Sequence, residues 1–290
     1  METNGLDRVD ATLPDELEAL VARVRAAARP VGPTIVCIAG GTSTGKSTQI
    51  AAPLVRALGP DARLLAQDMQ QRSLREQADP RYGFDHPEIY GIEACLRAIE
   101  RFRAGDALDW PRYDFVRRRH EGCVRVDAGA WLVLEGLHAL APALADAADL
   151  CLYAEAPAVV RLVRRILRNQ YERYPGLAVP GRTAAGFLGP VLRAHRDLVR
   201  PQRAAADLCV RTDRAFARLR DRFELAPITA GAGVETIRRV AFDARTTVAA
   251  LRDEAGAWRL RVEEMEVCHA DWAIGEDTAA AFAELDPEET

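Results

Sequence analysis

Short apolar runs alternate with amphipathic stretches over most of the chain, and the two patterns predict different elements. A strand covered by helices on both faces is apolar at successive positions, so continuous apolar runs of this length are typical of buried parallel strands. Five such runs occur, at PTIVCIAGG (33–41), ARLLAQD (62–68), WLVLEG (131–136), DLCLYAE (149–155) and ADLCVRT (206–212).

Helical periodicity fills the intervals between these runs. Apolar residues recur at helical spacing in residues 13–28, which predicts an amphipathic packing helix ahead of the main domain. Helices are also predicted over residues 46–59 and 87–105, each closed by a glycine. Strands that alternate with helices predict an α/β fold with a parallel, doubly wound central sheet flanked by helices.

Beyond about residue 225 the pattern weakens. PITAGAGVE (227–235) is typical of a loop, residues 234–252 are predicted as a helix, and WRLRVEEMEV (258–267) as an alternating strand. The sequence indicates no role for this part of the chain. The predicted organisation is an N-terminal helix in residues 1–30, a main domain in residues 31–225 and a small α+β extension in residues 226–290.

Composition and charge narrow the functional classes. The chain of 290 residues is 49% hydrophobic and 28% charged, as in ordinary soluble globular proteins. No run reaches the roughly 18 to 20 apolar residues of a membrane span, and the N-terminus lacks the apolar core of a signal peptide, so we expect a cytoplasmic protein without a membrane partner. A net charge of −4 creates no basic field, so no nucleic-acid partner is expected. Six cysteines are scattered singly and are expected to be reduced core residues.

The stretch GGTSTGKST fits the phosphate-loop pattern G-x-x-x-x-G-K-[ST], and it lies between a predicted buried strand and a predicted helix. Glycines let the backbone turn its N–H groups inward, and the helix N-terminus adds positive potential. Lys46 would reach the outer phosphates, and the Ser47 hydroxyl would ligate Mg²⁺. The residues predicted to bind a nucleotide are Gly40, Gly41, Thr42, Ser43, Thr44, Gly45, Lys46, Ser47 and Thr48.

Lys46 is also the only lysine in the chain, because the other 38 of the 39 lysines and arginines are arginine. Arginine carries a broad planar fork, whereas lysine is a compact point charge on a flexible stem. The chain departs from its arginine usage at the position where a narrow phosphate cradle excludes the larger group. This observation supports the phosphate loop independently of the glycine pattern.

Seven motifs follow one another in a definite order along residues 33–212. They are GGTSTGKST (40–48), LLAQD (64–68), FDHP (84–87), PRYDF (111–115), LEG (134–136), RLVRRILR (161–168) and VRPQRAAADLCV (199–210). With these motifs the chain resembles the uridine kinase and phosphoribulokinase family of P-loop kinases. The resemblance implies a P-loop NTPase fold and an activity that uses ATP and Mg²⁺.

The resemblance also implies roles for three acidic residues. Asp68 would be the base that accepts a proton from the attacking hydroxyl, Glu135 would lie near Mg²⁺, and Asp85 would bind a ribose. Carboxylates at the carboxyl edge of a parallel sheet lie where α/β folds place their ligands. The alternatives are a solvated aspartate at position 68 and a loop-bonding glutamate at position 135.

Four arginines fall at helical spacing on one side of a predicted helix: Arg161, Arg164, Arg165 and Arg168. Like charges in one stripe repel one another unless an anion is present. Phosphoryl transfer develops negative charge on the transferred group, so a lid bearing arginines, at about residues 161–185, would stabilise it. Arg164 and Arg168 are the candidate catalytic arginines. The alternative is a solvated face paired with acidic neighbours.

On the acceptor side the chain departs from the family pattern. Uridine kinases usually have a serine followed by aromatic residues after the aspartate, whereas this chain has Met69-Gln70-Gln71-Arg72. The family continues its YDF motif with a histidine and then an arginine that face the pyrimidine. Here the corresponding positions hold Arg118 and then His120, and the aromatic residues Tyr113 and Phe115 are kept.

Two interpretations of the run from Arg117 to Arg119 remain open. Guanidinium groups grip carboxylates and phosphates bidentately, so the run would suit an anionic acceptor such as a phosphorylated sugar. Alternatively the stretch is a hairpin, in which Arg117 and Arg119 share one face and at most one or two arginines reach the substrate. The candidate substrate-binding residues are Asp85, Tyr113, Phe115 and Arg118.

The leading hypothesis is an ATP-dependent kinase that phosphorylates a hydroxyl of a small sugar-containing acceptor, in the first place uridine or cytidine. A phosphosugar kinase is the second hypothesis. The third is a nucleotide-binding regulator that has lost its acceptor chemistry and uses residues 226–290 as a partner-binding surface. The sequence leaves the oligomeric state open, a homo-oligomer included.

Overall fold

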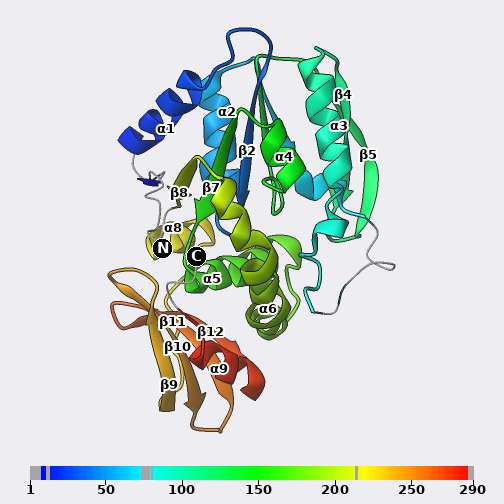
Figure 1. Cartoon of the computed structure of the whole chain (residues 1–290). Coiled ribbons are helices and arrows are strands. Elements are labelled where there is room, and N and C mark those ends of the chain that lie inside the picture. Colours follow the sequence, from blue (N-terminus) through cyan, green and yellow to red (C-terminus); the bar gives the residue numbers. More distant parts are fainter. Residues whose placement is uncertain (1–7, 11–13, 73–78, 80, 213–214, 287–290) are drawn as a thin grey trace. The chain divides into compact units, whose positions relative to one another are not determined.

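The computed structural model describes residues 8–10, 14–72, 79, 81–212 and 215–286, in two compact units (Figure 1). The first unit comprises Met1–Glu155 and Ala194–Asp213, and the second comprises Ala156–Arg193 and Arg214–Thr290. The chain therefore passes from the first unit to the second and back before it ends in the second. The predicted boundaries at residues 30 and 225 stay a prediction.

A parallel sheet of six strands forms the centre of the first unit. All five predicted strands are present, and a short strand near the N-terminus adds a sixth at one edge. In spatial order they are β1 (Arg8–Asp10), β8 (Leu208–Arg211), β7 (Leu150–Glu155), β2 (Thr34–Gly40), β6 (Trp131–Glu135) and β3 (Ala62–Ala66).

Helices cover both faces of this sheet, as the prediction of a doubly wound sheet requires. Successive residues of β2 face opposite sides: Val36 and Ile38 belong to a core cluster with α1 (Pro14–Ala26) and α2 (Ala52–Leu58). Ile35 and Cys37 belong to a second cluster with α3 (Ile92–Arg103) and α4 (Pro142–Ala147). Because side chains alternate across a strand, burial of both sets explains the continuous apolar run of β2.

The helix predicted over residues 46–59 begins with a π-helical turn, η1 (Lys46–Ala51), and continues as α2. The helix predicted over residues 87–105 is divided instead. A 3-10 turn, η3 (Pro87–Ile89), comes first, and α3 begins only after Gly91, which adopts a left-handed conformation with φ of +52°. A left-handed residue interrupts a right-handed helix, and glycine tolerates it without strain.

The remaining elements of the first unit are short. A 3-10 turn, η2 (Gln67–Gln70), follows β3, and β4 (Leu108–Asp114) pairs with β5 (Arg119–Val126) in an antiparallel hairpin. The turns η6 (His195–Val199) and η7 (Arg200–Ala205) precede β8. Five of the six cysteines are buried, as expected, but Cys123 is exposed because β5 is a solvent-facing strand.

The second unit combines helices with a four-stranded antiparallel sheet in the order β12-β11-β10-β9. Apolar residues of both parts form one continuous core cluster. The strands are β9 (Gly233–Ala241), β10 (Thr246–Asp253), β11 (Trp258–Glu264) and β12 (Val267–Ala273). The helices are α5 (Ala158–Arg168), η4 (Asn169–Arg173), α6 (Pro180–Gly186), η5 (Phe187–Val191), α7 (Leu192–Ala194, which extends into the first unit), α8 (Phe216–Arg222) and α9 (Glu276–Ala283).

The helix predicted over residues 234–252 is wrong, because β9 and β10 occupy this range as a hairpin. The stretch is rich in β-branched residues, which favour strands. Asp243 supports the connecting turn by accepting a hydrogen bond from the backbone N–H of Arg245 (2.8 Å). The strand predicted at residues 258–267 is confirmed over β11. Within the described residues, no helix is long and apolar enough to span a membrane.

Gly40, at the end of β2, lies closer to β7 than a side chain would allow. A Cβ atom on Gly40 would stand 2.6 Å from the carbonyl oxygen of Ala154, and the glycine has a φ of +148°. We predict that Gly40→Ala lowers the free energy of unfolding by about 2 kcal/mol, measured by urea denaturation, because one strand must shift.

Gly186→Ala is the control for this prediction. Gly186 lies in a helix with open space around the position of a Cβ atom, so alanine there should leave stability unchanged or raise it by roughly 0.5 to 1 kcal/mol. Equal effects of the two substitutions would contradict the close-approach argument.

Candidate active site

The carboxyl ends of three neighbouring strands bring the predicted site residues of the first unit together. In the sheet, Glu135 at the end of β6 lies in register with Ile38 of β2 on one side and with Ala66 of β3 on the other. The phosphate loop follows β2, and Asp68 follows β3 within the 3-10 turn η2, two residues past the last residue of the strand. The loop, Glu135 and Asp68 therefore share one edge of the sheet.

The phosphate loop is a closed turn held by its own polar groups. The Thr44 hydroxyl donates to the carbonyl of Gly41 (2.9 Å), and the Lys46 ammonium donates to the same carbonyl (3.3 Å). Gly45 has a left-handed φ of +95° and immediately precedes the helical turn that starts at Lys46. Thr212, from the segment after β8, donates its hydroxyl hydrogen to the carbonyl of Thr44. The loop thus presents a helix N-terminus and a buried lysine at the sheet edge.

Glu135 is a buried carboxylate beside this loop, and it accepts a hydrogen bond from the Ser47 hydroxyl (2.8 Å). Burial raises the pKa of Glu135 to about 6; the positive charge of Lys46 and the Ser47 hydrogen bond oppose this shift, and the negative charge of Asp68 adds to it. The influence of Asp68 on this pKa indicates that the two carboxylates lie near each other. The cluster therefore joins two acidic groups to the loop lysine.

The donor set fits a hard divalent cation. A hydroxyl and a carboxylate, 2.8 Å apart, supply the oxygen ligands that Mg²⁺ prefers. A cation would also compensate the cost of holding Glu135 ionised in a buried position. Ser47 and Glu135 are thus suited to hold Mg²⁺, and the assignment stays a prediction.

Gly136, which follows Glu135, is packed against a neighbouring side chain. A Cβ atom on Gly136 would lie 2.4 Å from the side chain of Gln67, so the space is taken by that residue. Gln67 is fully buried, and its Oε1 accepts a hydrogen bond from the backbone N–H of His138 (2.9 Å). Sequence reasoning overlooked Gln67. Its position, as a polar residue between a buried strand and a candidate base, was a signal that could have identified it.

His138 connects the strand edge to the segment that carries Asp85. Its Nε2 lies 2.8 Å from the carbonyl oxygen of Asp85 and its Nδ1 lies 3.2 Å from the amide nitrogen of Gln202. A carbonyl can only accept, so Nε2 carries the proton and Nδ1 accepts from the amide. Gln202 is fixed in that orientation because its Oε1 accepts from the backbone N–H of Leu140 (3.1 Å). These contacts give His138 a structural role.

The β4–β5 hairpin is attached to the segment that follows Asp68. The backbone N–H of Tyr113 donates to the sulfur of Met69 (3.4 Å), and Nε2 of His120 lies 2.9 Å from the carbonyl oxygen of Gln71. The ring of Tyr113 packs edge-on against the rings of Phe115 and His120, each at 5.3 Å between centroids. The structure therefore brings Tyr113 and Phe115 to the segment where the chain departs from the family pattern.

The run of three arginines lies at the tip of this hairpin, as the hairpin interpretation predicted. Arg117 pairs with Glu121 (2.9 Å), and Arg119 pairs with the same carboxylate (3.4 Å). Arg118 adopts a left-handed φ of +54°, and its guanidinium lies over the ring of Phe84 at 5.3 Å. Arg118 therefore differs in direction and partner from its two neighbours.

The arginine stripe lies on α5 in the second unit. Arg161 is fully buried, with its guanidinium over the ring of Phe187 at 5.6 Å, whereas Arg164, Arg165 and Arg168 are half-buried. Arg161 is therefore part of the unit's interior. Arg164 and Arg168 remain the candidate catalytic arginines, and the other predicted site residues all belong to the first unit.

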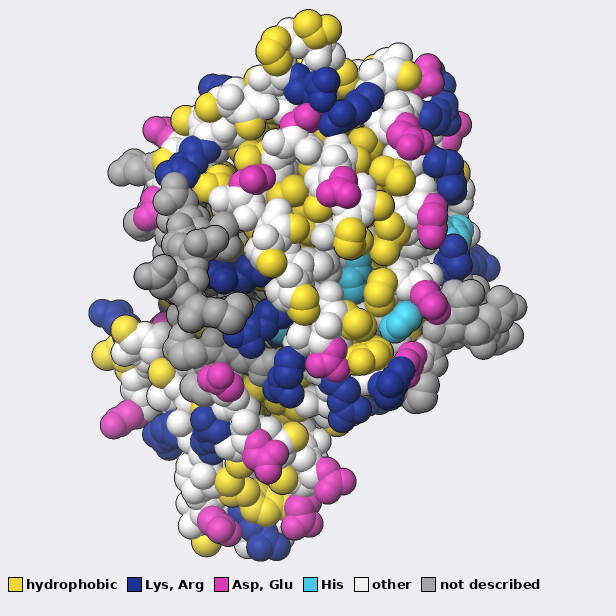
Figure 2. Space-filling view, viewed as in Figure 1, with side chains coloured by type: hydrophobic (Ala, Val, Ile, Leu, Met, Phe, Trp, Pro, Cys, Tyr) yellow, Lys and Arg dark blue, Asp and Glu magenta, His cyan; other side chains and the backbone are white. Residues whose placement is uncertain are grey.

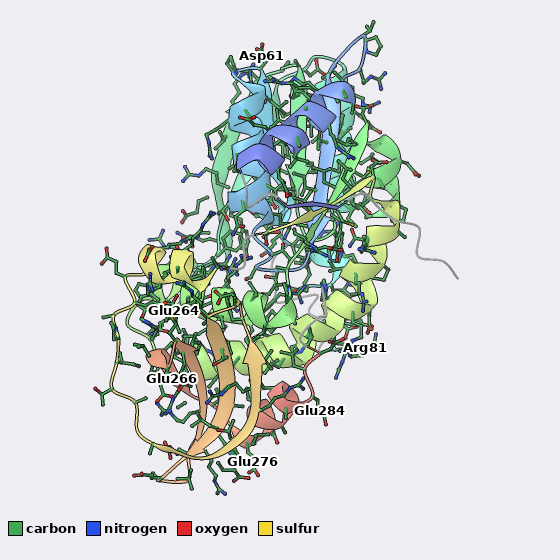
Figure 3. All side chains as sticks on the ribbon, turned by 90° about the vertical axis from the view of Figure 1, so that its left-hand side faces the viewer. Asp61, Arg81, Glu264, Glu266, Glu276 and Glu284 are labelled. Carbon is green, nitrogen blue, oxygen red and sulfur yellow. The ribbon has the colours of Figure 1, made fainter. Side chains whose placement is uncertain are left out.

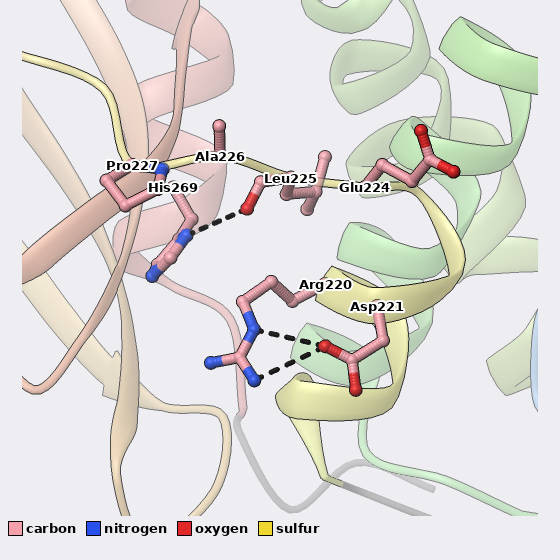
Figure 4. A pocket seen from close by; sticks show the side chains of 7 residues that line it. All are labelled: Arg220, Asp221, Glu224, Leu225, Ala226, Pro227 and His269. Atoms are coloured by element: carbon pink, nitrogen blue, oxygen red, sulfur yellow. Dashed lines mark hydrogen bonds and ion pairs between the residues drawn. The ribbon is translucent and has the colours of Figure 1, made fainter.

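Charged side chains of both signs are mixed on the surface. Figure 2 shows basic and acidic side chains interspersed over the face drawn. A hollow of about 390 Å³ lies in the second unit, next to α8 (Figure 4). Its arginine, Arg220, pairs with Asp221 (3.3 Å) and also with Glu264, so its charge is already compensated. The hollow lacks a glycine-rich loop and is therefore a poor candidate for the phosphate site.

Comparison with known proteins places these observations in a family. Residues 35–215 match the model of the phosphoribulokinase / uridine kinase family. A uridine kinase of Halobacterium salinarum is 33% identical over 184 residues, which are 60% of this chain and 77% of that protein. Uridine kinase-like protein 3 of Arabidopsis thaliana is 29% identical over 184 residues, which are 61% of this chain but only 39% of that protein.

A solved structure shares the fold. The structure from Silicibacter sp. TM1040, described as a fructose transport system kinase, superposes with a TM-score of 0.56 at 24% identity. The similarity covers 67% of this chain and 98% of that one. At this identity the likeness supports the fold, and it leaves about a third of this chain without a counterpart.

We predict that His138 makes stability depend on pH. Burial lowers the pKa of His138 from its ordinary value of 6.5 to about 4, so the unfolded chain binds more protons than the folded one between these values. The contribution of His138 to the free energy of unfolding is therefore fully present above pH 6.5. It is lost as the pH falls towards 4, which lowers the free energy of unfolding by about 3 kcal/mol. The free energy of unfolding of wild type, measured by urea denaturation, should exceed that of His138→Gln by a margin that narrows by this amount as the pH falls from 6.5 to 4.

Val133→Ala, a buried change that removes no titrating group, is the control and should lower the free energy of unfolding equally at each pH. Parallel pH profiles of wild type and His138→Gln would contradict the prediction.

Proposed function

Since the chain belongs to the phosphoribulokinase / uridine kinase family, we propose that this kinase uses ATP and Mg²⁺ to phosphorylate a hydroxyl of a small sugar-containing acceptor, in the first place a nucleoside. The observation that carries the proposal is the cluster of Lys46, Ser47, Glu135 and Asp68 at one edge of the parallel sheet. Phosphoryl transfer requires phosphate contacts, metal ligands and a base within a few ångströms of one another, and this cluster supplies a candidate for each.

On the donor side, backbone N–H groups of the phosphate loop would hold the phosphates of ATP, and Lys46 would exchange its bond to the Gly41 carbonyl for the outer phosphates. Ser47 and Glu135 would hold Mg²⁺, which neutralises charge on the phosphates when it is bound. The single lysine of the chain is then the residue whose compact charge fits this cradle.

On the acceptor side, Asp68 would orient the hydroxyl and take its proton as the oxygen attacks the γ-phosphorus. The bond from the γ-phosphorus to the bridging oxygen of ADP breaks in the same step, and ADP leaves with the bonding electrons. Asp68 can accept a proton only as a carboxylate. Because the negative charge of Glu135 lies nearby, that charge must be compensated by Lys46 and the cation. Arg164 and Arg168 of α5 would stabilise charge on the transferred group.

The partners of the hairpin arginines favour a nucleoside over a phosphorylated sugar. Arg117 and Arg119 already share the carboxylate of Glu121, which reduces their capacity to bind an anionic acceptor. Arg118 lies over the half-exposed ring of Phe84, next in sequence to the candidate ribose-binding Asp85. Aromatic rings and one guanidinium suit the flat face and the polar edge of a pyrimidine. A phosphosugar acceptor remains the alternative.

A non-catalytic regulator is the other alternative. The changed segment from Met69 to Arg72 motivates it, and the retention of Asp68 beside Glu135 argues against it. A chain that only binds nucleotide has no need for a second carboxylate beside its metal ligand. Binding of ATP without product from any acceptor would favour the regulator.

We predict that uridine or cytidine, offered with ATP and Mg²⁺, gives a monophosphate at a higher kcat/KM than ribulose 5-phosphate or fructose. In this assay Arg118→Gln should raise KM for the nucleoside several-fold with little change in KM for ATP. Arg117→Gln is the control and should leave both constants near those of wild type, because its side chain is engaged by Glu121. Preferred turnover of a phosphosugar, or equal effects of the two substitutions, would overturn the nucleoside assignment.

We predict that Asp68→Asn lowers kcat by about 10² to 10⁴-fold, since general-base catalysis contributes on this scale. The affinity for ATP, measured by calorimetry, should be nearly unchanged. Asp61→Asn is the matched control, because Asp61 is an exposed aspartate that precedes the same strand (Figure 3). Wild-type turnover by Asp68→Asn would rule out Asp68 as the base.

A further inference from the structure

The sheet formed by β9 to β12 lies outside the segment that matches the family, which ends at residue 215. The arginine helix α5 lies inside that segment, yet it belongs to the same compact unit as the sheet. Apolar residues of α5, among them Leu162, Ile166 and Leu167, join the core cluster that contains Trp272 of β12 and Phe282 of α9. An element of the kinase segment thus shares its core with an added sheet.

Polar and aromatic contacts attach the end of α5 to the C-terminal part of the chain. The helix continues without a break into η4. Three consecutive residues of η4 each contact a residue in the C-terminal part of the chain. Gln170 Oε1 accepts a hydrogen bond from Nε1 of Trp272 (3.0 Å). The ring of Tyr171 lies 5.6 Å from the ring of Phe223, and Glu172 pairs with Arg222 (2.6 Å).

These three contacts differ in how firmly they hold η4. The Glu172–Arg222 pair is exposed on both sides, and exposed ion pairs contribute little. Trp272 is 7% exposed, lies in register with Leu260 of the neighbouring strand β11 and belongs to the core cluster of the unit, so its indole is fixed. An indole N–H can only donate, which gives the bond to Gln170 a single direction. Trp272 is therefore the firm anchor among the three.

The neighbouring residue of β12 holds the next helix. A Cβ atom on Gly181 of α6 would lie 2.6 Å from the carbonyl oxygen of Ala273, so α6 sits directly against the end of β12. Asn169 of η4 in turn donates to the hydroxyl of Thr183 of α6 (3.2 Å). Two consecutive strand residues, Trp272 and Ala273, thus fix both η4 and α6.

We propose that the C-terminal sheet is the scaffold of the arginine helix, and that Trp272 is a positioning residue that sets, through Gln170, the direction in which α5 presents Arg164 and Arg168. The inference rests on the proposed function to the extent that these arginines act in phosphoryl transfer. Gln170 lies two residues beyond Arg168, and helix ends fray when they lose their partners. Because transfer depends on close positioning, fraying of this turn would slow it.

The test uses the full-length protein with Trp272→Phe, which keeps a ring in the core and removes the N–H donor, and Gln170→Met, which removes the acceptor. Each should lower kcat by about tenfold, the scale of one hydrogen bond, and leave KM for the acceptor and the affinity for ATP unchanged. The double variant should lose no more than either single one, because both remove the same interaction.

Trp258→Phe is the matched control. Trp258 lies in the same sheet, on β11, where its ring contacts the guanidinium of Arg252 at 5.4 Å. The same chemical change there should leave kcat at the wild-type value. If Trp258→Phe and Trp272→Phe slow turnover equally, the effect is one of general stability and the positioning role is overturned.

Amide hydrogen exchange supplies a readout that does not require kinase activity. Exchange at residues 166–173 should be faster in Trp272→Phe and in Gln170→Met than in wild type or Trp258→Phe. Should Trp272→Phe not fold, Gln170→Met carries the test alone, because its side chain is only half-buried.

Arg164→Gln and Arg168→Gln separate the two hypotheses. If neither slows turnover, the catalytic role of the arginines fails, and the exchange data still decide whether Trp272 anchors the helix. If Arg168→Gln slows turnover while Trp272→Phe and Gln170→Met alter neither turnover nor exchange, the scaffold inference is overturned.

Discussion

The hydrogen bond from Ser47 to the buried carboxylate of Glu135 ties the phosphate loop to the neighbouring strand, and the architecture of the first unit serves this contact. Burying a carboxylate costs free energy unless charge and hydrogen bonds compensate it. Here the compensation comes from one hydroxyl and one lysine, and the pKa of Glu135 is nevertheless raised. A protein under selection for stability alone would replace such a group, and this is the basis for the proposal that Glu135 helps to hold a cation.

The same contact depends on the parallel sheet. Strands β2, β3 and β6 end at one edge because all their neighbours run in the same direction, and the close approach of Gly40 to Ala154 keeps β2 and β7 together at that edge. Behind the edge, Gln67, His138 and Gln202 link the end of β3 to the segment carrying Asp85. A polar network thus joins the end of β3, next to Asp68, to the segment that carries the other candidate acceptor residue, Asp85.

The second unit shows how an added sheet can be incorporated into a kinase. Its strands do not form a separate core; their apolar residues mix with those of α5, α6 and η5. Arg161 illustrates the consequence, because one arginine of the predicted stripe lies in the interior beside Phe187. Spacing along a helix places four arginines on one side, but only the packing of that helix decides which of them remain accessible.

The sequence by itself determined the parallel sheet, the phosphate loop and the family, because each depends on local signals: continuous apolar runs, glycines at set spacing and motifs in order. The sequence failed at residues 234–252, where the spacing of apolar residues suits either a helix or a strand. There, β-branched residues that pair across the β9–β10 hairpin favoured strands. It also overlooked Gln67 and Trp272, whose partners lie 71 and 102 residues away along the chain. Only the tertiary structure decided these contacts, because a hydrogen bond between distant residues leaves no periodic trace in either segment.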